Sequence, residues 1–180
     1  MDTNRYSVPV DKAYRNLIIK AYPFRVVILH MDEVIASHPR CYGRKQDIFD
    51  PLHYLPLLEQ RPGAFEHAKP IRRWREGWPP VYERLLERLQ EQEPNGQSVR
   101  EFVRVLKLHH DHPAGLVAQA VEQALAYGCI HADGVELCLH QLENPEVPLS
   151  SLTAVDLPAW AHVGQQSLDL NCYDQLLDRV

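Results

Sequence analysis

The stretch RVVILHMDEVIASHPR, from Arg25 to Arg40, decides how the front of this 180-residue chain folds. Both halves are rich in β-branched residues, which favours two short antiparallel strands on either side of a tight polar turn. Asp32 suits the turn because its side chain can accept hydrogen bonds from nearby backbone amides. A two-stranded hairpin is only marginally stable in water, so the sequence must supply further strands beside it.

Two short apolar segments ahead of the hairpin are candidates for these strands. YSVPV begins at Tyr6, and RNLIIKAY, which begins at Arg15, alternates in part before Pro23 stops the pairing. Four short strands leave exposed edges unless the sheet curls on itself. The sequence therefore predicts a small SH3-like β-barrel as a first domain over residues 1–48.

Apolar residues recur at helical spacing from residue 50 to residue 143, which predicts four to six short helices. The pattern is clearest after Ser98, where Phe102 and Leu106 fall on one helix face. Ser98 and Glu101 also have the spacing of a capping box. The predicted fold class is α+β, with a helical domain over residues 49–143 behind the barrel. A flexible, irregular tail with a short amphipathic motif is expected over residues 144–180.

Charge is distributed unevenly along the chain, whose formal net charge is −5. Residues 1–45 carry eight Lys and Arg against four Asp and Glu, whereas residues 81–180 carry six against fifteen. A basic N-terminal part and an acidic C-terminal part indicate that the first contacts a polyanion and that the second does not. The alternative is an ordinary solvated surface.

The sequence contains none of the short motifs that mark phosphate loops, dinucleotide sites or nucleophile elbows. The cluster HHDHP contains three histidines, from His109 to His112, but neighbouring helical residues point about 100° apart and cannot all reach one ion. We therefore expect no catalytic residue, no metal and no cofactor. The absence of a long apolar window or a signal peptide predicts a cytoplasmic protein with no membrane contact.

A basic and aromatic run, IRRWREGWPPVY, supports two interpretations. Arg72, Arg73 and Arg75 flank Trp74, and arginine beside an aromatic ring is a usable surface for a nucleic-acid backbone. In the alternative interpretation, the tryptophan anchors a loop onto the helical core, with solvated arginines beside it. The sequence leaves both open.

Several blocks in a fixed order resemble one protein family. The blocks are Tyr6–Val10, Lys20–Tyr22, Val34–Arg40, Tyr42-Gly43 and Asp50–Ala64, with weaker matches in REFVRVLKL and YDQLL. They resemble the C-terminal part of the transposases of the insertion-sequence-21 family, which are relatives of the phage Mu transposase. In that family a helix-turn-helix region and an RNase H-like domain with a DDE acid triad precede a β-barrel and a helical region. The resemblance implies a non-catalytic part of a DDE transposase, because the catalytic acids have no counterpart here.

The resemblance also implies partners for each part of the chain. The barrel would contact transposon-end DNA and neighbouring transposase protomers, and the helices and tail would contact proteins that include an AAA+ helper ATPase. The expected phosphate contacts are Arg25, Arg40, Arg44 and Lys45, with Arg15 and Lys20 behind them. The expected protein-binding residues, which suit capture of a helix in a groove, are Leu170, Tyr173, Leu176 and Leu177.

Two alternatives to this function stay open. In the first, the chain is a protein-interaction module that recruits the AAA+ helper ATPase without binding DNA itself. In the second, it is a gene remnant with no selected activity.

Overall fold

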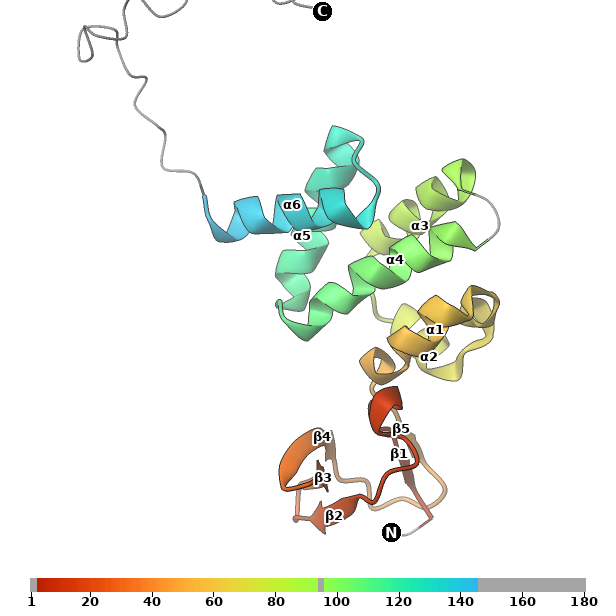
Figure 1. The fold of residues 1–180 in the computed structure, drawn as a ribbon, viewed down its shortest axis with the longest axis vertical. Helices are drawn as coiled ribbons and strands as arrows, with labels where there is room; N and C mark the ends of the chain where they lie inside the picture. Colours follow the sequence, from red (N-terminus) through yellow and green to blue (C-terminus); the bar gives the residue numbers. More distant parts are fainter. Residues whose placement is uncertain (1–2, 94–95, 146–180) are drawn as a thin grey trace, which may run out of the picture. The chain divides into compact units, whose positions relative to one another are not determined.

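The strands lie at the front of the chain in a computed structural model that describes residues 3–93 and 96–145 (Figure 1). A three-stranded antiparallel sheet has the order β2 (Ile18–Ala21), β3 (Arg25–His30) and β4 (Glu33–Pro39). Two further strands, β1 (Arg5–Tyr6) and β5 (Asp47–Ile48), pair with each other in parallel. Within the part of the chain that the structure describes, these are two separate sheets.

The predicted hairpin is present as β3 and β4. Met31 and Asp32 form its two-residue turn, and both have positive φ, 48° and 67°, as a type I′ turn requires. The register shifts by one residue after Ile28, which is the signature of a β-bulge. The inward face of the sheet buries Val26, Ile28 and Ala36.

Helices occupy the chain from residue 51 to residue 143, as the apolar spacing predicts. The α-helices in the described residues are α1 (Leu55–Gln60), α2 (Lys69–Arg75), α3 (Pro80–Gln92), α4 (Gln97–Lys107), α5 (Ala114–Tyr127) and α6 (Ala132–Glu143). Short 3-10 turns occur at Val10–Lys12, Pro51–Tyr54, Pro62–His67 and Leu108–His110. Asp50 caps the second of these, since its Oδ1 accepts a hydrogen bond from the Leu52 amide at 2.9 Å.

The helical core is centred on α4, which packs against α1, α3 and α6. Phe102 has no exposed surface, and its ring meets those of Phe65, Trp78 and Tyr82 at centroid distances of 5.8, 5.5 and 6.4 Å. The rings meet nearly edge to face, which is a favourable geometry for aromatic pairs. The predicted apolar face of this helix is therefore the centre of the core.

The expected capping box is wrong. The helix begins after Gly96, whose φ is 83°, and no side chain caps it. Glu101 Oε2 instead accepts a hydrogen bond from the Ala132 amide at 3.1 Å, at the start of α6. The carboxylate thus satisfies one of the unpaired N–H groups of a different helix, where the dipole also favours negative charge.

Residues Met1–Asn144 group as one compact unit by their contacts. The proposed boundary near residue 48 and the proposed tail therefore stay predictions. No helix in the described ranges is both long enough and apolar enough to cross a lipid bilayer.

Candidate nucleic-acid interface

The segment that follows β4, residues 40–46, is here called the basic loop. Its backbone is held by Asn4, whose Nδ2 donates hydrogen bonds to the carbonyl oxygens of Cys41 (2.9 Å) and Gly43 (2.7 Å). Asn4 Oδ1 accepts a hydrogen bond from the Gln46 amide at 2.9 Å. These side-chain contacts fix the loop backbone without using the basic side chains that it carries.

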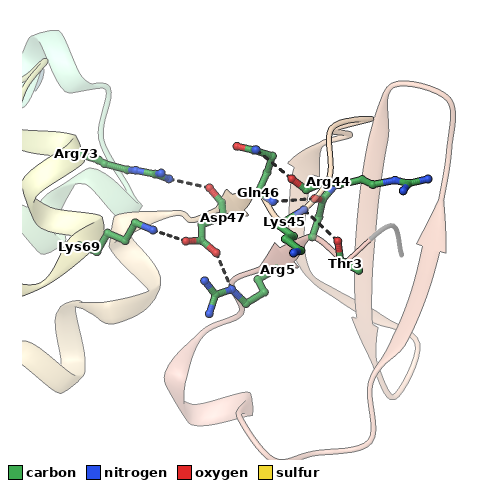
Figure 2. Close-up of polar contacts among 9 residues, drawn as sticks. Thr3, Arg5, Arg44, Lys45, Gln46, Asp47, Lys69 and Arg73 are labelled. Carbon is green, nitrogen blue, oxygen red and sulfur yellow. Dashed lines mark hydrogen bonds and ion pairs between the residues drawn. The ribbon is translucent and has the colours of Figure 1, made fainter.

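Three of the predicted phosphate contacts lie on this loop: Arg40 at its start, and Arg44 and Lys45 near its end. The Lys45 amide donates a hydrogen bond to Thr3 Oγ1 at 3.0 Å, and Lys45 has a φ of 54°. Figure 2 shows the Arg44 side chain pointing away from Asp47. The Arg44 and Lys45 side chains are both exposed to solvent.

A cluster of cations surrounds Asp47 at the end of the loop (Figure 2). Arg5 Nε lies 2.6 Å from its carboxylate, and Lys69 Nζ of α2 also pairs with it. Arg73 Nη1 donates a hydrogen bond to the Asp47 carbonyl oxygen at 2.8 Å. The hydrogen bond from Lys69, followed by that from Arg5, lowers the pKa of Asp47. The Asp47 carboxylate, only 4% exposed, thus pairs with two cations, and the carbonyl oxygen of the same residue binds a third. Three cations beside one acid leave this surface with an excess of positive charge.

At the other end of the loop five residues form what we call the Tyr–Arg tip: Tyr22, Phe24, Arg25, Arg40 and Tyr42. The Arg25 guanidinium lies 5.2 Å from the centre of the Tyr22 ring, and that of Arg40 lies 4.7 Å from the centre of the Tyr42 ring. Arg40 Nη1 also donates a hydrogen bond to the Tyr22 carbonyl oxygen at 3.1 Å. Stacking on aromatic rings orients each guanidinium without neutralising it.

The structure brings four of the six predicted cations together along the tip and the loop. Arg25 and Arg40 meet at the tip, and Arg44 and Lys45 follow on the loop. Lys20 is on β2 and Arg15 is in the turn before it, so neither belongs to the tip or the loop. Within residues 3–93 and 96–145, none of these six cations forms an ion pair with a carboxylate.

No sequence pattern singled out Arg5 and Lys69, because these two residues meet only through the fold. The residues of the basic and aromatic run IRRWREGWPPVY fall into two groups. Trp78 is buried in the helical core, and Arg75 pairs with Glu83, which raises the pKa of Arg75. Arg73, by contrast, reaches the Asp47 cluster. The run thus supplies both a tryptophan anchor, in the connection between α2 and α3, and an arginine on α2 that joins the Asp47 cluster.

A buried network joins the strands to the first helical turn. Ser7 Oγ lies 2.8 Å from His53 Nδ1 and accepts a hydrogen bond from the Asp50 amide at 2.8 Å. His38 Nε2 lies 2.7 Å from the Ser7 carbonyl oxygen, so this nitrogen must carry the proton and donate it. Ser7 and both histidines are buried, which gives the three residues a structural role rather than access to a substrate.

The predicted protein-binding residues near the C-terminus lie outside the described residues. The histidine cluster is partly structural, because His109 Nε2 lies 2.9 Å from the Tyr82 hydroxyl within the core. Burial lowers the pKa of His109 and raises that of Tyr82 to about 12. In the described part of the chain, no three acidic, histidine or cysteine side chains converge as a metal site would require.

Comparisons with known proteins agree with the resemblance. The family model described as "Mu transposase, C-terminal domain" matches residues 1–50. A transposase of Aminobacter aminovorans is 33% identical over 147 residues, which cover 79% of this chain and 28% of that protein. The transposase for insertion sequences IS1326/IS1353 of Pseudomonas aeruginosa is 35% identical over 130 residues, which cover 69% of this chain and 24% of that protein.

The chain therefore spans about a quarter of the length of the curated relatives that it matches. No solved structure matches it. On these matches, the chain belongs with the transposases of the insertion-sequence-21 family, related to the phage Mu transposase, and corresponds to their C-terminal part.

Proposed function

We propose that the chain is the non-catalytic DNA-binding and assembly part of a transposase, and that its front cations contact the phosphates of transposon-end DNA. One observation carries the proposal. Arg25, Arg40, Arg44 and Lys45 follow one another along the tip and the basic loop, and residues 37–46 contain no acid. Phosphates arriving there release counterions, which is the main source of sequence-independent affinity for DNA.

The Asp47 cluster extends this surface onto the helical part. Arg5 is on β1, whereas Lys69 and Arg73 are on α2, so a DNA backbone bound along the loop would meet cations from both parts of the chain. The five strands would be the counterpart of the family's β-barrel. Arg15 and Lys20 would make outer contacts.

DNA affinity should fall steeply as salt rises. The four contacts of the tip and the basic loop alone should give the plot of log K against log salt a slope of about −3.6, and each further phosphate contact should add about −0.9. Replacing Arg44 and Lys45 together by alanine should reduce the magnitude of the slope by about 2. The measurement is fluorescence anisotropy of labelled transposon-end duplex with the full chain, between about 50 and 200 mM salt.

The matched control for this experiment is the double replacement of Arg84 and Arg88 by alanine. Both are exposed arginines, but they lie on α3 away from the basic loop. This variant should keep the wild-type slope. Absence of binding at the lowest salt, or equal slopes for the two double variants, would reject the proposed surface.

The acidic excess after residue 81 favours a second role in protein contacts, with other transposase protomers and an AAA+ helper ATPase as partners. Deleting residues 166–180 should then abolish capture of the ATPase in a pull-down assay and leave DNA affinity unchanged. If the shortened chain captured as much ATPase as the full chain, residues 166–180 would not be the recruitment site.

A further inference from the structure

Phe24 is the most exposed aromatic side chain of the Tyr–Arg tip, at 89%. Single exposed apolar residues are common on protein surfaces, so exposure alone carries no argument. Phe24 differs because the backbone on both sides of it is fixed. The Phe24 carbonyl oxygen accepts a hydrogen bond from the Arg40 amide at 2.9 Å, and the Tyr42 hydroxyl donates one to the Pro23 carbonyl oxygen at 2.7 Å.

The turn that carries Phe24 is closed by one further bond, from the Tyr22 amide to the Arg25 carbonyl oxygen at 2.8 Å. Pro23 restricts the backbone immediately before the ring. The backbone that carries this solvent-exposed ring is thus fixed. Little backbone entropy is lost when the ring enters a ligand.

The charges around the ring indicate what that ligand is. Arg25 and Arg40 flank Phe24 in the fold, and both guanidinium groups stack on tyrosine rings without an acidic partner among the described residues. A protein partner would have to supply acids at both positions. Duplex DNA supplies a phosphate on each side of every base step, and its stacked bases accept an apolar wedge.

We propose that Phe24 inserts between adjacent base pairs of the bound DNA, while Arg25 and Arg40 hold the phosphates on either side. This proposal rests on the proposed DNA-binding function and adds a deformation to it, because insertion unstacks one step and kinks the duplex. The step should be one that unstacks easily, such as a pyrimidine–purine step or a mismatch.

Met31 provides a matched comparison within the same sheet. It is 87% exposed and lies in the turn of the neighbouring hairpin, between β3 and β4. Asp32 and Glu33 follow it directly, and these acids would repel phosphates. The two turns therefore present similar apolar side chains with opposite surrounding charge.

The test uses the full chain with duplexes of about 25 base pairs, labelled at both ends for energy transfer, with and without a central mismatch. Wild-type protein should shorten the end-to-end distance and bind the mismatched duplex several-fold more tightly. Phe24→Ala should abolish the bend and lower affinity about tenfold, while the salt slope stays as in wild type. Phe24→Leu should keep part of the bend, and Met31→Ala should behave as wild type.

The outcomes separate this proposal from the proposed function. If wild type binds with the expected salt slope but does not bend DNA, and Phe24→Ala binds equally well, the wedge is overturned and phosphate binding stands. If wild type fails to bind at low salt, both proposals fall. If Phe24→Ala leaves DNA affinity and bending unchanged but lowers the mass of the protein assembly in sedimentation, Phe24 contacts another polypeptide and the wedge is again overturned.

Discussion

Replacing Phe102 with alanine is expected to lower the free energy of unfolding by about 3–5 kcal/mol. The ring is fully buried, and the rings of Phe65, Trp78 and Tyr82 surround it, so truncation leaves a cavity among three large side chains. Phe65 is in the 3-10 turn Pro62–His67, Trp78 is in the connection between α2 and α3, and Tyr82 is on α3. These segments cannot close the cavity together without moving relative to one another. A loss of this size is a large fraction of the stability of an ordinary domain, about 5–15 kcal/mol.

Urea titration followed by tryptophan fluorescence measures this loss, because Trp78 lies against the ring that is removed. Leu137→Ala is the control, since Leu137 is exposed on α6 and its loss should change stability by at most about 0.5 kcal/mol. Equal unfolding midpoints for the two variants would show that Phe102 is not at the centre of the core.

Acidification from about pH 7.5 to about pH 5.5 is expected to destabilise the fold. Burial lowers the pKa of His53 and His109 from the usual 6.5. As the pH falls, the unfolded chain therefore binds protons at these histidines before the folded chain does. The stability that the neutral histidines contribute is complete above pH 6.5 and is lost as the pH falls below that value. Each histidine contributes at most about 1.4 kcal/mol per pH unit.

The neighbours of His53 act in both directions. His38 and His110 lower its pKa further, whereas Asp50 raises it. The carboxylates with lowered pKa, Asp47 and Glu83, lose their contribution only in more acid solution, so histidines dominate this range.

Thermal unfolding at several pH values, compared between wild type and His53→Gln, tests this prediction. The variant should lose less stability on acidification, because one of the two titrating groups is gone. His67→Gln is the control, as His67 is exposed and should leave the pH dependence unchanged. Parallel curves for wild type and His53→Gln would contradict a neutral, buried His53.

Local pattern was enough to predict the hairpin and the helical region. β-branched residues on both sides of Asp32 and the apolar spacing around Phe102 are properties of short windows. The parallel pair β1–β5 had no such signal, because each strand has two residues and the Arg5–Asp47 contact joins positions 42 apart. Glu101 was expected to cap the start of its own helix, α4, but it caps α6. The local pattern could not show this, because its partner Ala132 lies 31 residues away.

The candidate interface was predictable only as a list of cations. Counting charge selected Arg25 and Arg40, but their meeting at the Phe24 turn depends on the pairing of β3 with β4. Lys69 is 22 residues from Asp47 and lies on a helix whose pattern gave no sign of the contact. Sequence reports how much charge a segment carries, whereas the fold determines which charges share a surface.

The burial of the Ser7 network has a practical consequence for handling the protein. Salt screens the contacts of exposed cations with DNA, and it also screens the Asp47 pairs, because the side chains of Arg5 and Lys69 are 74% and 57% exposed. The buried hydrogen bonds of Ser7 with His53 and with the Asp50 amide are not charge pairs between exposed groups, so salt should leave them in place. A concentrated salt wash during purification should therefore strip contaminating DNA from the protein while the Ser7 contacts keep the strands joined to the first helical turn.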